Sequence, residues 1–233
     1  MDEFPFVSVL CPTRDRRAFL PRLIAMFQRQ DWPKDRLELI VVDDGRDRVR
    51  DLIPTDDPRV RYEALDQRVP LGNKRNRLCQ LAEGEILVHM DDDDWFPDTR
   101  VTRAVEGLRT SGAEVVGTSD LAFWDYRSRA IHLVPRIGPK HVCAGTMAYP
   151  KTYWEKAKWA PDPHTEERQF LQNFAAKVAH LPGNPWDTVL CISHGENILP
   201  KNTNLPRAKV TLADVVTDPA DRAFYESIDP DAW

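Results

Sequence analysis

Four consecutive aspartates, Asp91 to Asp94, follow directly on the apolar segment EILVHM at 85–90. Carboxylates held this close repel one another, and burying them without partners costs free energy. A shared divalent cation would relieve the repulsion, because Mg²⁺ and Mn²⁺ take oxygen ligands and are often held by carboxylates together with phosphate oxygens. The cluster therefore favours a metal–nucleotide site over a solvated acidic turn.

Two more polar clusters stand at the ends of apolar segments. PTRD at 12–15 follows FVSVLC, and DDG at 43–45 follows LELIVV. In a parallel α/β sheet, ligands bind in the crevice outside the carboxyl ends of the strands, where all three clusters would lie. Polar loops after strands are ordinary, but that explanation accounts for one acidic cluster better than for three. The pattern predicts a ligand site at one edge of a sheet.

The elements that must position these clusters alternate along the first half of the chain. Apolar runs predict strands at 6–11, 37–44, 59–65, 85–90 and 113–117, and amphipathic patterns predict helices at 18–30, 72–84 and 97–112. Strands that are apolar almost throughout and are separated by helices indicate a mostly parallel sheet covered by helices.

The second half is less regular. LAFWDY and AIHLVP, separated by RSR, predict a β-hairpin, and TVLCISH at 188–194 predicts a last strand. TEERQFLQNFAAKVAH predicts one helix over 165–180. Residues beyond Asn204 are weakly patterned, and we expect them to pack on the surface or to be partly mobile. No flexible linker separates the halves, so we expect them to share one sheet.

Composition limits the classes of protein to consider. The 233 residues carry a net charge of −5, which argues against general affinity for nucleic acid. The basic knots RDRR at 14–17 and NKRNR at 73–77 are expected to be solvated helix ends. No apolar run approaches the roughly 20 residues of a membrane span, and the N-terminus lacks the pattern of a signal peptide. The sequence predicts a cytoplasmic protein with, at most, peripheral membrane contact.

The cysteines are far apart and form no CxxC pair. They are Cys11, Cys79, Cys143 and Cys191. Each stands in an apolar context, so we expect reduced and mostly buried thiols.

Phosphate-cradling glycine loops are missing from the sequence. Neither GxxxxGK[ST] nor GxGxxG is present, which removes the main support for a P-loop or dinucleotide-binding protein. A divalent ion would then have to carry the phosphate charge. The reaction that the sequence predicts is therefore one in which a metal ion assists the departure of a diphosphate.

The ordered series of motifs resembles the family 2 glycosyltransferases of the GT-A fold. VSVLCPTRD is similar to the family's opening strand and Pro-Thr turn, and LELIVVDDG is similar to its IIVVDDGS strand, with Arg46 in place of Ser. PLGNKRNRLCQLAEGEILVHMDDDDW resembles the stretch that carries the family's Arg-Asn and Asp-x-Asp-Asp motifs. HTEERQF and SHGEN stand where the family places Glu-Asp before an aromatic residue and a late His-x-x-Asn. Together these motifs span most of residues 6–204.

The resemblance implies an α/β fold of the GT-A type, with a mostly parallel central sheet flanked by helices and a smaller mixed or antiparallel acceptor-side portion. We expect one domain over 1–205, followed by a C-terminal tail at 206–233. About 1–118 would bind the nucleotide sugar, and about 119–205 would bind the acceptor and carry the base. The implied reaction is inverting transfer from a UDP-linked sugar to a hydroxyl of a glycan, lipid or small molecule, with Mn²⁺ or Mg²⁺ as cofactor.

The resemblance also implies roles for single residues. The positions that would border the nucleotide are Pro12, Thr13, Arg14, Asp15, Asp43, Arg75, Asp91 and Asp92. Among them, Asp43 would accept a hydrogen bond from the base, typically from uracil N3–H, and Asp92 would approach the ribose. Asp93 would bind the metal, and Asp94 would orient ligands. His194 would close over the diphosphate or the metal.

An inverting transfer needs a carboxylate that takes the proton of the acceptor hydroxyl as its oxygen attacks the anomeric carbon. The family pattern points to Glu166 and Glu167, with Glu167 in place of the usual Asp. In the predicted helix, Glu167 shares a face with Phe170, Leu171 and Phe174, at i+3, i+4 and i+7, so it would face inward. Glu166 would lie about 100° around the helix, among polar neighbours. We predict Glu167 as the base and Glu166 as the second choice.

Three other classes fit parts of the pattern. A nucleotidyltransferase would be expected to carry a glycine-rich loop and a lysine after the first strand, and CPTRDRR has neither. A phosphoacceptor signalling module would suit VVDD but would leave the second half unexplained. A nucleotide-sugar-binding protein without transfer activity would need the acidic edge but no base at Glu167.

Overall fold

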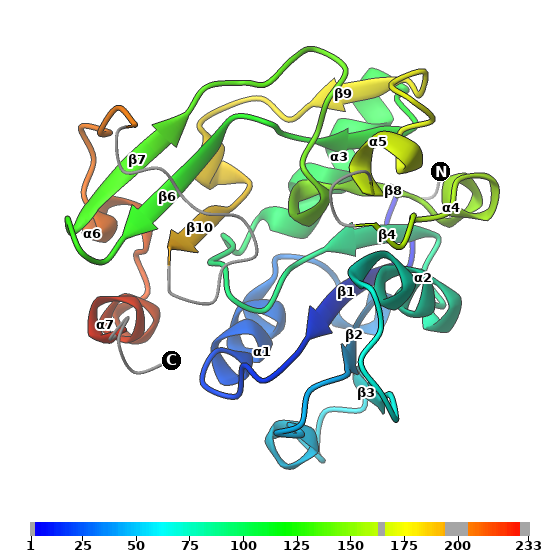
Figure 1. Cartoon of the computed structure of the whole chain (residues 1–233), viewed down its shortest axis with the longest axis horizontal. Coiled ribbons are helices and arrows are strands. Elements are labelled where there is room, and N and C mark those ends of the chain that lie inside the picture. The colour runs from blue at the N-terminus through cyan, green and yellow to red at the C-terminus, as the bar shows by residue number, and fades with distance from the viewer. Residues whose placement is uncertain (1–2, 163–165, 194–204, 229–233) are drawn as a thin grey trace.

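The computed structural model describes residues 3–162, 166–193 and 205–228. In these ranges the chain forms a seven-stranded sheet in the order β3-β2-β1-β4-β8-β5-β9 and a three-stranded sheet in the order β10-β6-β7 (Figure 1). Helices pack on both faces of the large sheet. This is the α/β architecture that the sequence predicts.

The first four strands form the predicted parallel half of the large sheet. They are β1 (Val7–Thr13), β2 (Leu37–Asp43), β3 (Val60–Ala64) and β4 (Ile86–His89). β1 lies between β2 and β4 and is parallel to both. Every residue of β1, β2 and β4 is buried, as in strands covered on both faces. The carboxyl ends of these three strands therefore meet at one edge, with Thr13 opposite Asp43.

Alternate residues of the strands face two separate apolar layers. Val7, Val9 and Cys11 of β1 pack into the layer that contains α1 (Leu20–Arg29) and α3 (Arg100–Ser111). Leu10 packs into the opposite layer, with α2 (Leu71–Leu81) and α4 (Lys151–Lys156). The two-residue period of a strand thus fills both cores and holds the helices against the sheet.

The second half completes the large sheet and builds the small one. β5 (Val115–Gly117), β8 (Ala148–Pro150) and β9 (Val178–His180) extend the large sheet, and β8 is antiparallel to both β4 and β5. β6 (Leu121–Asp125) and β7 (Ala130–Val134) form the predicted hairpin, and β10 (Leu190–Ser193) runs parallel to β6. The expectation that both halves share one sheet is therefore only partly right.

The predicted helix over 165–180 is wrong. Only α5 (Glu166–Phe170) is helical, and the chain then passes through three left-handed residues, Gln172, Asn173 and Phe174, with φ of 52°, 55° and 65°. Left-handed residues cannot continue a right-handed helix. They reverse the chain so that β9 pairs with β5. Pairing at the edge of the sheet has overridden a helical pattern in the sequence.

The C-terminal segment contains α6 (Leu212–Val215) and α7 (Pro219–Ser227). The Asp218 carboxylate caps α7 by accepting hydrogen bonds from the backbone N–H groups of Ala220 and Asp221. α7 packs on the α1 side, where Tyr225 is buried and the Phe224 ring meets that of Phe19 edge to face.

Short 3₁₀ turns complete the described elements. They are η1 (Lys34–Arg36), η2 (Arg50–Leu52), η3 (Ala144–Thr146) and η4 (Pro185–Asp187). Among the described residues, no helix combines the length and apolar character needed to span a membrane.

Candidate active site

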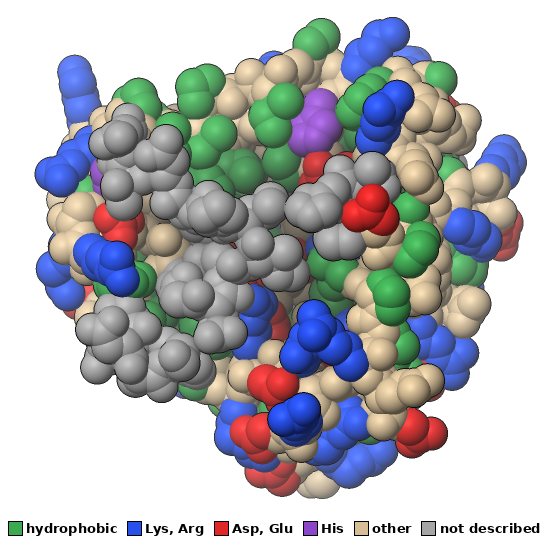
Figure 2. All heavy atoms as spheres, in the orientation of Figure 1, with side chains coloured by type: hydrophobic (Ala, Val, Ile, Leu, Met, Phe, Trp, Pro, Cys, Tyr) green, Lys and Arg blue, Asp and Glu red, His purple; other side chains and the backbone are tan. Residues whose placement is uncertain are grey.

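A hollow of about 530 Å³ opens beside the carboxyl ends of β1 and β2, which is within the usual range for small-molecule sites. Its lining residues are Arg14, Asp15, Asp44, Gly45, Arg46, Arg48, Asp66, Gln67 and Arg68. Four guanidinium groups among these residues give the hollow a polar, cation-rich wall suited to an anionic ligand. Figure 2 shows basic and acidic side chains crowded on the lower part of this face, over β2 and β3.

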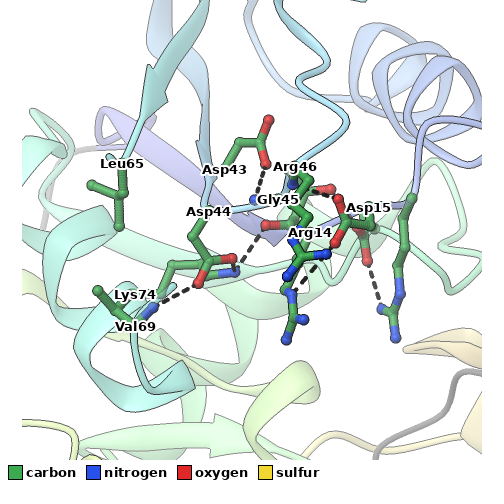
Figure 3. Close-up of polar contacts among 12 residues, drawn as sticks. Arg14, Asp15, Asp43, Asp44, Gly45, Arg46, Leu65, Val69 and Lys74 are labelled. Atoms are coloured by element: carbon green, nitrogen blue, oxygen red, sulfur yellow. Dashed lines mark hydrogen bonds and ion pairs between the residues drawn. The ribbon is translucent and has the colours of Figure 1, made fainter. Parts of the chain in front are cut away.

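The two aspartates at the end of β2 have different surroundings (Figure 3). Asp43 is fully buried, and its carboxylate accepts hydrogen bonds from Gly45 N, Val49 N and the Tyr62 hydroxyl at 2.8, 3.2 and 2.8 Å. Asp44 lines the hollow and pairs with Lys74. Asp43 is not among the residues that line the hollow, and its contact with a base stays a prediction; Asp44 is one of three acids on the wall, with Asp15 and Asp66.

The PTRD cluster forms the opposite wall. Pro12 and Thr13 are the last residues of β1, whereas Arg14 and Asp15 lie on the surface of the hollow. Asp15 has a left-handed backbone with φ of 52°, and its Oδ1 accepts from the N–H groups of Arg46 and Asp47. Burial raises the pKa of Asp15, but these N–H groups outweigh it and hold the pKa below its usual value. The carboxylate thus ties the loop after β1 to the loop after β2.

Asp92 and Asp93 share one guanidinium group. Arg16 NH1 lies 2.9 Å from Asp92 Oδ1 and 2.8 Å from Asp93 Oδ2, and the Thr13 hydroxyl donates to Asp92 Oδ2 at 2.6 Å. Burial raises the pKa of Asp92; Arg16 opposes this, Asp93 adds to it, and the result is a pKa of about 6. The two neighbouring carboxylates repel each other, and a cation shared between them would stabilise their ionised forms.

These carboxylates fit a divalent metal. They offer hard oxygen ligands, which suit Mg²⁺ or Mn²⁺, and they lie side by side at the edge of the sheet. Asp93 remains slightly exposed, with 11% of its side chain open to solvent. Asp93 would be the metal ligand on this geometry. His194, the second predicted metal ligand, lies outside the described residues.

Arg75 and Asp91 form a two-pronged pair on the other side of the cluster. Arg75 NH1 and NH2 donate to Asp91 Oδ1 and Oδ2 at 3.0 and 3.2 Å. Arg75 is buried, and its Nε lies 3.9 Å from Glu166 Oε1. A Cβ added to Gly145 would lie 2.8 Å from Asp91 Oδ2, so the η3 turn approaches this carboxylate closely. The pair joins the acidic cluster to α5.

The two glutamates of α5 point to different places. Glu166 is 6% exposed and faces Arg75, and its Oε2 has no hydrogen-bond partner among the described residues. Burial raises its pKa to about 7, with Arg75 opposing and Asp91 adding to the shift. Glu167 keeps 30% of its side chain exposed, accepting from Ala144 N at 2.6 Å and lying 2.8 Å from His141 Nε2. The interpretation of Glu167 as part of an inward helical stripe is wrong, because the helix ends at Phe170.

Asp94 turns away from the other three aspartates. Its Oδ1 accepts a hydrogen bond from Ile192 N at 3.0 Å, and its backbone carbonyl accepts one from the Tyr225 hydroxyl at 3.1 Å. Asp94 thus contacts β10 and α7.

Sequence reasoning found Arg14 and Arg75 but missed two other cations of the site. Arg16 and Lys74 belong to the knots that we expected to be solvated, yet Lys74 is 4% exposed and donates to Thr13 O at 2.8 Å. The available signal was the charge balance: buried carboxylates need nearby cations, and both knots flank strands that end at the acidic edge.

Solved structures share this fold. The chain aligns with Staphylococcus aureus TarS in complex with UDP-GlcNAc at a TM-score of 0.65 and 18% identity, over 82% of this chain and 59% of that one. It aligns with the mannosyltransferase of Pyrobaculum calidifontis in complex with GDP-Man and Mn²⁺ at a TM-score of 0.63 and 17% identity, over 82% and 57%. The fold is therefore of the GT-A glycosyltransferase type.

Sequence comparison gives the family. The family model described as glycosyl transferase family 2 matches residues 8–175, which is more than half of the chain. This chain belongs to glycosyl transferase family 2. It is also 41% identical over 120 residues to the GalNAc(5)-diNAcBac-PP-undecaprenol beta-1,3-glucosyltransferase of Campylobacter jejuni. That match covers 48% of this chain and 38% of the relative, so the chain spans well under half of that protein.

Proposed function

We propose that this chain is a metal-dependent, inverting glycosyltransferase that moves a sugar from a UDP-linked donor to an acceptor hydroxyl. One observation carries the proposal: two runs of side-chain contacts, which meet at the adjacent residues Asp92 and Asp91, lead from the hollow to α5. Asp44 pairs with Lys74, Lys74 donates to Thr13, and Thr13 donates to Asp92. From the adjoining Asp91, the contacts continue through Arg75 to Glu166. This run of contacts supports treating the hollow, the acidic cluster and Glu166 as parts of one site.

The hollow would bind the nucleotide. Its guanidinium groups can pair with phosphate oxygens or stack on a base, and Asp44 can accept a hydrogen bond at the pocket wall. Asp92, Asp91 and Arg75 would then border the ribose and the donor sugar. A bound Mn²⁺ or Mg²⁺ at Asp93 would stabilise the leaving diphosphate.

Glu167 would be the base because of its exposure to solvent, and no longer because of helical periodicity. An acceptor arrives from solvent, and the base must touch the hydroxyl that attacks. Glu167 is 30% exposed, whereas Glu166 is 7% exposed in its side chain and faces Arg75. We therefore keep Glu167 as the base and place Glu166 on the donor side.

The acceptor would be a hydroxyl of a glycan, lipid or small molecule. The name of the Campylobacter jejuni relative contains a lipid-linked saccharide, GalNAc(5)-diNAcBac-PP-undecaprenol. A saccharide on a polyprenyl diphosphate is therefore the first acceptor class to test.

The deciding experiment combines donor screening with two matched variants. Purified protein with Mn²⁺ is incubated with a panel of UDP-, GDP- and TDP-sugars, and release of the nucleoside diphosphate is measured with and without acceptors. We expect one UDP-sugar to be used and Glu167→Gln to lower turnover by about 10²–10⁴-fold, while UDP still raises its melting temperature. Glu166→Gln should keep more activity than Glu167→Gln. Nucleotide binding without turnover of any donor would instead identify a binding protein, and equal activity of both variants would remove the base assignment.

A further inference from the structure

Three side chains of different chemistry converge beside α5, away from the aspartate cluster. His141, Cys143 and Glu167 each offer one ligand atom, and these atoms lie within 4.8 Å of one another. His141 Nε2 and Glu167 Oε2 are already 2.8 Å apart. All three residues are partly exposed, so an ion can reach them from solvent.

The backbone around the cluster is firmly held. Cys143 N donates to Thr118 O at 2.9 Å, and the Thr146 hydroxyl oxygen lies 2.9 Å from Thr118 O and 2.7 Å from Cys143 O, so that its one proton is donated to either carbonyl. Ala144 N donates to Glu167 Oε1 at 2.6 Å, which fixes the carboxylate against this turn. Two of the three ligand residues, Cys143 and Glu167, are therefore held in place by hydrogen bonds to this turn or within it.

The three ligand atoms suit a different ion from the one that suits the aspartate cluster. A thiolate, an imidazole and a carboxylate are typical ligands of Zn²⁺, with Zn–S near 2.3 Å and Zn–N and Zn–O near 2.0 Å. In a tetrahedral site these lengths place ligand atoms about 3.3–3.5 Å apart. The aspartate cluster offers oxygen alone, which suits Mg²⁺ or Mn²⁺.

Local charge also favours a cation here. Cys143 has a pKa well above its usual value because of burial and because Glu167 and Asp120 are negative. A cation at the thiol would be attracted by both carboxylates. The Phe174 ring, 5.9 Å from the His141 ring, provides an apolar cover on one side.

We infer that His141, Cys143 and Glu167 form a Zn²⁺ site whose occupation blocks sugar transfer. The fourth position would be left to water. The inhibitory part rests on the proposed role of Glu167, because a carboxylate bound to Zn²⁺ cannot take a proton from the acceptor. The proposed binding of Zn²⁺ rests only on the arrangement of these three residues.

Binding has a defined proton balance. Cys143 must lose its thiol proton to become a ligand, and that proton passes to the buffer. Zn²⁺ affinity therefore rises with pH while the thiol is protonated. No oxidation or reduction is involved.

Binding is tested without any activity measurement. Protein stripped with a chelator is titrated with Zn²⁺ against a chromophoric chelator, in excess Mg²⁺ to occupy the aspartate cluster. Co²⁺ is then substituted to detect the near-ultraviolet charge-transfer band of a cobalt–thiolate bond. We expect the wild type to bind one equivalent of Zn²⁺ and to show the thiolate band with Co²⁺. In Cys143→Ala the band should be absent and the affinity for Zn²⁺ should be at least tenfold weaker. Cys191→Ala, on β10, should behave as the wild type.

The same variants test the inhibitory part. With Mn²⁺ held constant, one equivalent of Zn²⁺ should suppress transfer by the wild type and by Cys191→Ala, and leave Cys143→Ala active. Equal Zn²⁺ affinity of wild type and Cys143→Ala, or the absence of a thiolate band, would overturn the site. Stoichiometric binding that leaves transfer intact would overturn the inhibition and count against Glu167 as the base. If Zn²⁺ binds as expected but no donor is turned over under any condition, the proposed function fails and the metal site stands.

Discussion

The Arg16 guanidinium group lies between two neighbouring carboxylates of the aspartate cluster. Arg16 NH1 lies within 3 Å of both Asp92 and Asp93, which is the position that a divalent cation would need to share. Arg16 therefore stabilises these carboxylates, and a metal bound there would compete with it or displace it.

Arg16→Gln tests this competition. Removing one partner of a buried ion pair is strongly destabilising, and because Arg16 is 19% exposed we expect a loss of up to about 3 kcal/mol. Mn²⁺ should restore much of the lost stability, because it supplies the missing positive charge. Thermal unfolding with and without Mn²⁺ measures both effects. Arg17→Gln, whose partners Asp47 and Asp51 are exposed, should change little, and a metal response no larger in Arg16→Gln than in this control would contradict the argument.

Glu166 gives the protein a defined pH dependence. Its pKa is raised from 4.5 to about 7, so the folded state binds the proton more tightly than the unfolded state does. The stability that this provides is complete below about pH 4.5 and is lost as the pH rises through 7. At about 1.4 kcal/mol per pKa unit, ionised Glu166 destabilises the fold by at most about 3 kcal/mol.

Glu166→Gln should therefore unfold at a higher temperature than the wild type at pH 8. The difference should shrink between pH 7 and pH 4.5 and vanish below that range. Glu155→Gln, on the exposed part of α4, is the control, and a Glu166→Gln profile parallel to that of the wild type would show that Glu166 titrates normally.

At the scale of elements, a buried series of hydrogen bonds connects β4, β8 and α2 next to the site. His89 Nδ1 lies 3.1 Å from Arg75 NH1, and His89 Nε2 lies 2.7 Å from the Tyr149 hydroxyl. Arginine can only donate, so Nδ1 accepts and Nε2 carries the proton. Burial, together with Arg75 and Arg100, lowers the pKa of His89 well below its usual value, in keeping with a neutral ring. The hydrogen bond to His89 thus helps to orient the Arg75 guanidinium group toward Asp91.

Tyr149→Phe should break this series of hydrogen bonds. The Tyr149 hydroxyl accepts from His89 Nε2 and from Trp159 Nε1, and losing it leaves two buried donors unpaired, at about 1–3 kcal/mol each. We expect a stability loss of about 2–5 kcal/mol and a raised KM for the donor as Arg75 loses its support. Denaturant unfolding and donor kinetics measure these effects. Tyr153→Phe removes a single donor to Phe170 O, and an equal or larger loss there would refute the special role of Tyr149.

The sequence predicts the elements of the first half well because their stabilisation is local and repetitive. Apolar strands such as 37–43 and amphipathic helices such as 20–29 carry their burial pattern in their own residues. The stretch at 165–180 does not carry its structure in its own residue pattern. Its structure depends on the pairing of β9 with β5, and no helical period encodes that contact. The acidic residues of the site could be predicted from strand ends. The need of these acids for nearby cations was a signal for Arg16, but which carboxylates Arg16 pairs with, and the role of His89, depend on the side chains that the fold brings beside them.

On the scale of the whole molecule, the aspartate cluster is also where the two sheets are joined. Trp95 and Leu190 exchange backbone hydrogen bonds at 3.0 and 2.9 Å, and Ile192 N donates to Asp94 Oδ1. Tyr225 of α7 donates to Asp94 O. The large sheet, the small sheet and the C-terminal segment therefore meet at Asp94, so its carboxylate serves assembly in addition to charge.

The pair Asp94→Asn and Asp94→Ala separates assembly from metal binding. Asn keeps an oxygen that can accept from Ile192 N, whereas Ala leaves that N–H unpaired, at about 1–3 kcal/mol. We expect Asp94→Asn to keep its stability within about 1 kcal/mol and to retain the Mn²⁺–UDP shift in melting temperature. Asp94→Ala should lose stability, and its nucleotide affinity should weaken because β10 is no longer held against the cluster. The measurements are thermal unfolding and calorimetric titration with UDP and Mn²⁺. Should Asp94→Asn lose the metal-dependent shift completely, Asp94 would be a metal ligand, and the joint between the sheets would not depend on its carboxylate.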